Sequence, residues 1–125
     1  MVGEKLLIRL AGAVLGMTLI AATLSAQQGG VPVDRVHKGS SLVALSDVPV
    51  RDRPPGGGAL YVPGQQTGYV RSGETIEVSE EQIVSTLLGN QKWVYFSRQK
   101  QLSPSNGWVL VGKAGNTSDS FGAKR

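Results

Sequence analysis

Cysteine is absent from this chain of 125 residues, and histidine occurs once, at His37. Without a thiol there are no disulfides to support the fold, no lipid-modified N-terminal cysteine and no cysteine nucleophile. A lone histidine gives no metal-ligand set, and because His37 falls in a stretch that resembles a linker, no Ser-His pair is expected. We therefore expect no metal, no cofactor and no nucleophilic catalysis.

Acidic residues are also few, and four of the nine cluster as Glu74, Glu77, Glu80 and Glu81. Hydrolysis by general acid–base chemistry needs two carboxylates held on either side of the reacting bond. This cluster falls at a turn and at the end of a predicted strand, where carboxylates are ordinarily solvated. We therefore predict that the protein is not an enzyme.

Long runs of one charge are missing as well. The net charge is +4, and the basic residues are scattered, so no segment has the length of a nucleic-acid-binding arm. Such an excess keeps a small domain soluble, with weak attraction to an anionic polymer or a membrane surface as the alternative. We expect no nucleic-acid partner.

One long apolar run is present, close to the N-terminus. Residues 10–24 carry no charge, follow the basic Lys5 and Arg9, and are followed by small residues, a pattern typical of a secretory signal peptide. The run is shorter than the roughly 20 residues that span a bilayer. We predict a signal-peptide helix over 1–26 and export to the periplasm or the cell exterior. Retention of 6–26 as a membrane anchor and a buried core helix are the alternatives.

The two ends of the remaining chain show little apolar periodicity. Residues 27–40 contain three glycines and a proline and are predicted to be a flexible linker. Residues 114–125 are rich in Gly, Ser and Lys and are predicted to be a disordered tail. Between them, 41–113 is predicted to be one folded domain.

The segment 41–113 consists of short runs of β-branched and aromatic residues separated by turn-forming residues. Runs spaced by about 8–12 residues, without a helical block, indicate a small barrel or sandwich. We predict an all-β fold of five to six short strands. Pro49 indicates that its run forms a sheet edge, where proline is tolerated. The predicted strands are 41–45, 48–53, 65–70, 75–79, 91–97 and 106–111.

The segment 79–89 is ambiguous between a helix and a hairpin. Ser79 begins a capping-box pattern, and Gly89 fits the end of a helix. Against this, residues 83–86 are β-branched or hydroxyl-bearing, and Gly89-Asn90 is a two-residue hairpin signal. We favour the hairpin, because an isolated helix this short is marginal, whereas a hairpin adds strands to a sheet that needs partners.

Aromatic residues make up only 6% of the chain, and both tryptophans lie in the last two predicted strands. Because side chains alternate between the faces of a strand, either Val94 and Phe96 or Trp93 and Tyr95 point away from the core. Outward Trp93 and Tyr95 would form an aromatic surface. The expected core consists of Leu42, Ala44, Val50, Tyr69, Ile76, Val78, Trp93, Val94, Phe96, Trp108 and Val109.

Four short motifs occur in an order that resembles the bacterial SH3-like (SH3b) domain, over about residues 41–112. They are Pro49-Val50-Arg51-Asp52-Arg53-Pro54, Gly73-Glu74-Thr75-Ile76-Glu77-Val78, Lys92-Trp93-Val94-Tyr95-Phe96 and Gly107-Trp108-Val109. The resemblance implies a small SH3-like barrel used for binding, often of cell-wall peptides or partner proteins, and it implies no catalysis. The chain departs from the family pattern in longer connections over 54–70 and 79–89.

Large planar side chains lose little entropy on binding, and arginine pairs with carboxylates through a planar fork. We expect an aromatic groove that holds a short extended peptide, with an arginine pairing a carboxylate. The first hypothesis is an exported, non-catalytic cell-envelope module that binds cell-wall peptide. The second is a small structural or accessory subunit that binds an envelope protein. The candidate groove residues are Arg51, Arg53, Tyr61, Tyr69, Trp93 and Tyr95.

Overall fold

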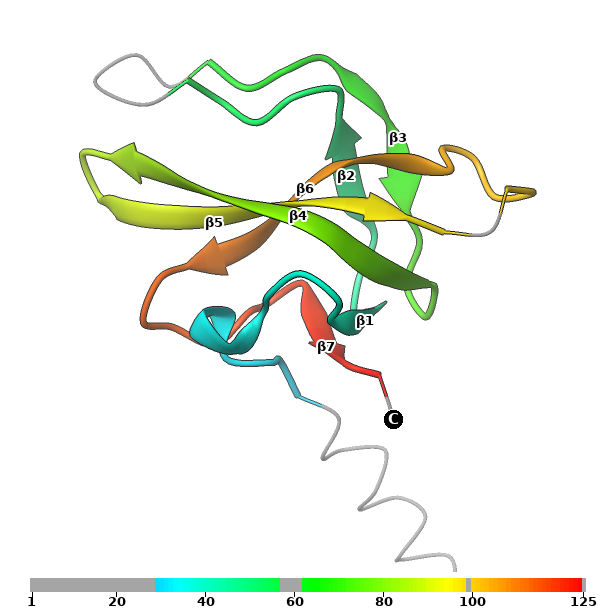
Figure 1. The fold of residues 1–125 in the computed structure, drawn as a ribbon, viewed down its shortest axis with the longest axis horizontal. Coiled ribbons are helices and arrows are strands. Elements are labelled where there is room, and N and C mark those ends of the chain that lie inside the picture. The colour runs from blue at the N-terminus through cyan, green and yellow to red at the C-terminus, as the bar shows by residue number, and fades with distance from the viewer. Residues whose placement is uncertain (1–28, 57–61, 99, 125) are drawn as a thin grey trace, which may run out of the picture.

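The computed structural model describes residues 29–56, 62–98 and 100–124. They form seven antiparallel strands in one curled sheet, shaped as half of a barrel, and one short 3-10 helix (Figure 1). The predicted all-β fold is confirmed, with seven strands in place of the expected five to six. The elements are η1 (Val33–Arg35), β1 (Ser41–Ala44), β2 (Val48–Arg51), β3 (Gln66–Val70), β4 (Thr75–Thr86), β5 (Gly89–Ser97), β6 (Asn106–Lys113) and β7 (Phe121–Ala123).

The predicted signal peptide over 1–26 lies outside the described residues. Within the ranges that are described, no helix has the length and hydropathy required to cross a bilayer.

The strand order is β3-β2-β6-β5-β4-β1-β7, with the long β4–β5 hairpin at the centre of the sheet. The pairing of β4 with β5 shifts register between Val78 and Glu80, which marks a β-bulge. The bulge changes the face on which alternate residues of β4 lie. Ile76 and Val78 therefore face the core, whereas Val84 is buried on the opposite face.

The segment 79–89 forms a hairpin, as the sequence favoured, but its turn lies at Leu87-Leu88 and not at Gly89-Asn90. Thr86 pairs with Gly89. The Thr86 hydroxyl donates to Gly89 O at 2.6 Å and accepts from the Leu88 N–H at 3.2 Å, so a side chain closes the turn. Gly89 follows with a φ of +121°, a conformation that glycine adopts without strain.

The core lies on one face of the sheet. Val94 and Phe96 point into it, so Trp93 and Tyr95 lie on the opposite face. Every expected core residue belongs to it except Trp93, Tyr69 and Trp108: the first is buried on the opposite face, and the others are exposed or half-buried. Three strand valines that the sequence analysis did not assign also belong to the core: Val48, Val70 and Val111.

Both ends of the described chain belong to the core, so the flexible linker over 27–40 and the disordered tail over 114–125 are wrong for the residues described there. Val33, Val36 and Phe121 are fully buried. The last of these begins β7, which pairs with β1. The sequence did not indicate these contacts, because both segments contain few apolar residues. A few buried side chains are enough to fix a short segment when the neighbouring strands supply the rest of the apolar surface.

Two buried polar side chains tie the ends to the sheet. Ser118 Oγ donates to Val111 O of β6 at 2.6 Å, and Lys92 Nζ of β5 donates to Val36 O at 2.8 Å. Each hydrogen bond pairs a buried side-chain donor, which would destabilise the fold if it were left without a partner. The packed unit therefore extends on both sides of the predicted 41–113 domain.

Gly107, near the start of β6, lies close against Val50 of β2. A Cβ at this position would lie 2.3 Å from Val50 Cγ1, and its φ is +152°. We expect Gly107→Ala to lower the free energy of unfolding by about 2 kcal/mol, because the methyl group overpacks the junction of β2 and β6. Urea unfolding followed by tryptophan fluorescence measures it.

The matched control is Gly56→Ala. A Cβ on Gly56 meets no atom of the described residues within 4 Å, and its φ lies outside the left-handed region. This variant is expected to stay within about 0.5 kcal/mol of wild type. Equal effects at the two glycines would contradict the close approach of β2 and β6.

Candidate functional site

The face of the sheet opposite the core, the outer face, carries most of the aromatic residues. Trp93 and Tyr95 project from β5, and Trp108 and Leu110 project beside them from β6. The ring centroids of Tyr95 and Trp108 lie 5.5 Å apart with the planes tilted by 59°, a geometry in which aromatic rings attract. The sheet therefore brings three aromatic side chains together on the outer face.

Two more of the predicted groove residues lie on the same face, Arg51 on β2 and Tyr69 on β3. Arg51 opposes Trp108 of β6, and Pro49 opposes Tyr69 of β3. Val48 and Val50 alternate with Pro49 and Arg51 and point into the core. The outer face thus holds four of the six candidate groove residues: Arg51, Tyr69, Trp93 and Tyr95.

A crevice, the β2–β6 crevice, lies on the outer face. Among the described residues, Arg51 of β2 is paired with Trp108 of β6. Pro49 lies beyond that pair and has no N–H with which to continue the pairing. β2 is flanked by β3 and β6, so the expected sheet edge is wrong for this strand. The crevice has a volume of about 230 Å³ and is lined by Val48, Pro49, Arg51, Pro63, Trp93, Leu110 and Ser120.

Trp93 gives the crevice an apolar wall. The residue is 4% exposed, so only a small part of its side chain is accessible from the crevice. Its Nε1–H donates to Gln91 Oε1 at 3.2 Å, which satisfies the polar end of the indole. The remaining surface of the ring favours an apolar group in the crevice over water.

Arg51 places a cation in the crevice lining. The side chain is half-buried, and Nη1 donates to Gly64 O at 3.1 Å. Asp52 Oδ1 accepts from the Gln65 N–H at 2.8 Å, so two neighbouring residues hold the segment that carries Pro63. A half-buried guanidinium beside apolar walls is suited to a carboxylate, because desolvation strengthens a charge-assisted hydrogen bond.

Tyr69 lies beside the crevice, next to Pro49, and is 37% exposed. The Arg71 guanidinium lies over its ring, with Cζ 5.0 Å from the centroid, and Nη1 of the same arginine donates to Asp47 Oδ2 at 3.0 Å. The Ser72 backbone N–H, and then Arg71, hold the pKa of Asp47 below its usual value. The ring is therefore oriented by a charged neighbour before any ligand arrives.

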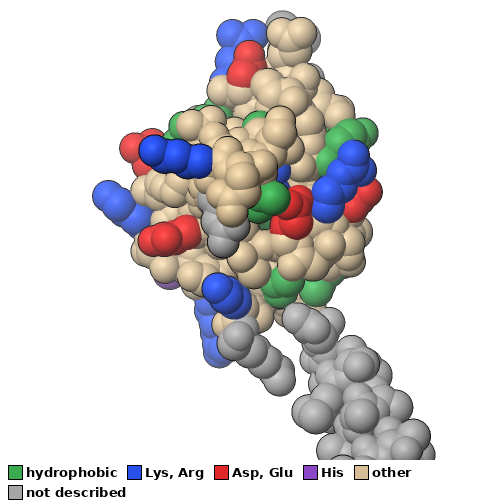
Figure 2. Space-filling view, turned by 90° about the vertical axis from the view of Figure 1, so that its right-hand side faces the viewer, with side chains coloured by type: hydrophobic (Ala, Val, Ile, Leu, Met, Phe, Trp, Pro, Cys, Tyr) green, Lys and Arg blue, Asp and Glu red, His purple; other side chains and the backbone are tan. Residues whose placement is uncertain are grey.

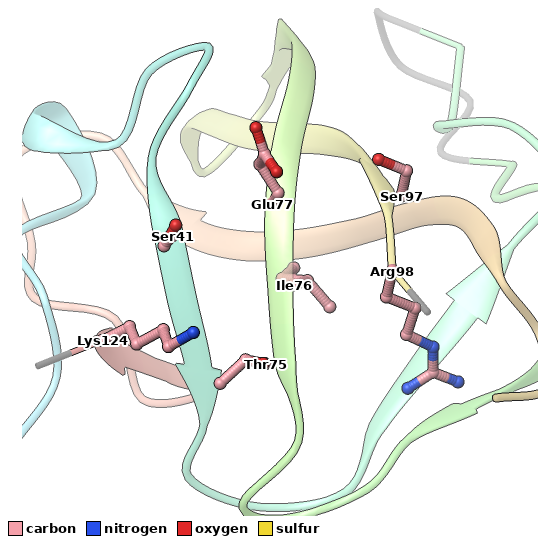
Figure 3. Close-up of a pocket in the computed structure, with 7 residues that line it drawn as sticks. All are labelled: Ser41, Thr75, Ile76, Glu77, Ser97, Arg98 and Lys124. Atoms are coloured by element: carbon pink, nitrogen blue, oxygen red, sulfur yellow. The ribbon is translucent and has the colours of Figure 1, made fainter. Parts of the chain in front are cut away.

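A second hollow, of about 290 Å³, lies on another part of the surface and is polar. Figure 3 shows Lys124 on one side of it and Arg98 on the other, with β4 between them. The Arg98 side chain is 1% exposed and is bound to Glu74 Oε1 at 2.9 Å, so it serves the fold. The lining also includes Ser41, Thr75, Ile76, Glu77 and Ser97.

The polar hollow offers mixed charge and hydroxyl groups without a chemical set for catalysis. Among the described residues of its lining, Glu77 is the only carboxylate and none is a histidine. Across the described ranges, no group of three acidic or histidine side chains could hold a metal ion. Figure 2 shows acidic and basic side chains interspersed on one face of the molecule, with hydrophobic groups only in small patches. The β2–β6 crevice is therefore the better candidate site.

Of the six predicted groove residues, only Arg51 and Trp93 belong to the described lining of the crevice. Tyr69 and Tyr95 lie on the outer face outside that lining. Arg53 lies in the exposed bend after β2, and Tyr61 falls outside the described residues. The sequence analysis missed the other described lining residues, which are Val48, Pro49, Pro63, Leu110 and Ser120. Alternation along the strand that carries Trp108 would have placed Leu110 on the outer face, but nothing in the sequence indicates where β2 leaves β6.

Comparisons with protein-family models, with curated proteins and with solved structures found no match.

Proposed function

We propose that this protein is a non-catalytic binding module whose β2–β6 crevice holds a side chain of a short extended peptide. The observation that carries the proposal is the juxtaposition of Trp93 and Leu110 with the Arg51 guanidinium in one crevice. The volume of about 230 Å³ lies below the roughly 300–1,000 Å³ of sites for whole small molecules, so it suits one group of a longer ligand.

The proposed ligand is cell-wall peptide. A wall peptide offers small apolar side chains and free carboxylates, which match the apolar walls and Arg51 respectively. Support for this class comes from the resemblance to SH3b domains and from the apolar run at 10–24, which predicts export. In this proposal the seven-stranded half-barrel is an SH3-like barrel acting in the cell envelope.

A second candidate function is binding of an envelope protein by the same face. Tyr69 is 37% exposed, and Val62, next to Pro63, is 59% exposed. Exposed apolar side chains bordering a crevice are common at protein interfaces. In this version the chain is a structural or accessory subunit, and the crevice receives a side chain of the partner.

The test is co-sedimentation of the full chain with purified peptidoglycan sacculi. We expect Arg51→Gln to weaken the affinity for sacculi by about tenfold or more, since loss of one charge-assisted hydrogen bond is worth roughly 1.5–3 kcal/mol. Arg53→Gln removes the same charge two residues away, outside the crevice lining, and is expected to leave binding within about twofold of wild type.

Circular dichroism confirms that both variants are folded before binding is compared. Equal losses for Arg51→Gln and Arg53→Gln would place the effect in net charge and contradict a role for the crevice. If wild type stays in the supernatant, wall peptide is excluded. A photo-cross-linker at Leu110 then tests the second candidate by capturing an envelope protein.

A further inference from the structure

The tip of the β4–β5 hairpin exposes two adjacent leucines. Leu87 is 86% exposed and Leu88 is 83% exposed, and Ile83, behind them on β4, is 49% exposed. Figure 1 shows this hairpin extending to the left of the molecule, on the side opposite the turn between β3 and β4. The tip is therefore a convex apolar projection, separate from the β2–β6 crevice in its residues.

Leucines are unusual at these two positions. Two-residue hairpin turns favour Gly, Asn and Asp, whose backbone and side chains suit the turn. Here the Thr86 hydroxyl closes the turn, so the leucine side chains are not needed for its geometry. They contribute nothing to the core and leave apolar surface in water, which is unfavourable unless another apolar phase covers it.

The charge around the tip is basic. A Cβ on Gly89 would lie 2.7 Å from Lys113 Cε and 3.6 Å from its Nζ, so this ammonium group lies at the tip. Along the described hairpin the first carboxylate is Glu81, opposite Val94, five residue pairs behind Thr86–Gly89. At about 3.4 Å per residue that distance is roughly 17 Å.

Two acidic residues are described near or beyond the end of β6. Asp34 of η1 accepts from the Gly115 N–H at 3.2 Å, and Asp119 lies in the connection to β7, six residues after Lys113. The outermost part of the hairpin therefore combines two exposed leucines with one lysine. This combination is that of a membrane-interfacial tip, in which apolar groups enter the acyl boundary and lysine reaches to the headgroups.

We propose that Leu87 and Leu88 insert into the interfacial region of a bilayer that contains anionic phospholipid, with Lys113 at the headgroups. Two side chains on a turn cover far less than the roughly 800 Å² per partner of a stable protein interface. A bilayer has no such requirement, because each apolar group enters it independently. The contact orients the domain at a membrane surface, and its anionic preference follows from the ammonium group.

The absence of cysteine allows a site-specific test in the full chain. Leu88→Cys and Ser72→Cys are each labelled with the fluorophore NBD, the second as a control in the opposite turn. Each is mixed with vesicles of phosphatidylcholine and phosphatidylglycerol in equal parts, or of phosphatidylcholine alone. Because the predicted export segment at 10–24 is itself expected to bind lipid, the readout is NBD emission at the labelled position and not sedimentation.

At Leu88 we expect a blue shift and at least about a twofold rise in NBD emission with anionic vesicles, and a smaller response with phosphatidylcholine. Adding Leu87→Asp is expected to abolish the response, and Lys113→Gln is expected to reduce the anionic preference. The label at Ser72 is expected to remain in water. Circular dichroism establishes that each variant is folded.

Two results overturn the proposal. If the Leu88 label stays in water while the protein sediments with the vesicles, another segment binds the bilayer and the tip does not. If the Leu88 emission shifts with protein concentration in the absence of vesicles, a second copy of the chain covers the tip. Neither result affects the crevice, whose test uses sacculi and Arg51.

Discussion

Phe121→Ala is expected to lower the free energy of unfolding by about 4 kcal/mol, the range observed for large aromatic side chains removed from a core. Phe121 is fully buried and begins β7, which pairs with β1. Its backbone N–H is also held by Ser118 Oγ at 3.0 Å. Since domains of this size are stable by only about 5–15 kcal/mol, the variant should unfold at a much lower urea concentration.

The measurement is equilibrium urea unfolding of the full chain followed by tryptophan fluorescence. Lys124→Ala is the matched control, because Lys124 is exposed three residues further along the same end of the chain. It is expected to stay within about 0.5 kcal/mol of wild type. A loss below about 1 kcal/mol for Phe121→Ala would mean that the end of the chain is dispensable, as its composition predicted.

Arg98→Ala is expected to cost about 3 kcal/mol, because it removes a buried cation from three acceptors at once. Arg98 donates to Glu74 Oε1 at 2.9 Å, to Pro104 O at 2.6 Å and to Tyr69 O at 3.3 Å. Its Cζ also lies 5.7 Å from the centroid of the Phe96 ring. Glu74 retains 21% exposure, which places the expected cost at the lower end of the range for broken buried pairs.

The control for Arg98→Ala is Arg71→Ala. The ion pair of Arg71 with Asp47 is 3.0 Å long, similar to that of Arg98 with Glu74, but its side chains are 64% and 49% exposed. Surface pairs contribute about 0–1 kcal/mol, so this variant should unfold near the wild-type midpoint. Similar losses for the two arginines would show that burial does not set the strength of the Arg98 contacts.

Local residue patterns were sufficient for the strands and for part of the site. Alternation along 91–97 left two possible orientations, and only the packed sheet selected Val94 and Phe96 for the core. Trp93 and Tyr95 then lay outward, as the sequence allowed. Trp108 was expected in the core, but it opposes Arg51 and Tyr95 on the outer face. Strand alternation from buried Val109 would have predicted this position.

In the β4–β5 hairpin, the local sequence predicted the hairpin correctly but not the position of its turn. Gly89-Asn90 is the stronger two-residue turn signal, yet the turn lies at Leu87-Leu88. The register is set by the whole β4–β5 ladder, from Glu77 opposite Ser97 onward. A shift of register would carry every side chain of β4 to a new partner, and that cost exceeds the preference of one dipeptide.

The sequence by itself determined the all-β class and the approximate strand positions, because these depend on residue type and on a period of two. It also determined that the chain has no cysteine and one histidine. The tertiary structure alone decided that Val33, Val36 and Phe121 complete the core, and where β2 leaves β6 to open the crevice. Both depend on contacts between residues far apart in the chain. Such contacts leave no local period, because burial is decided by which surfaces meet and not by what precedes or follows a residue.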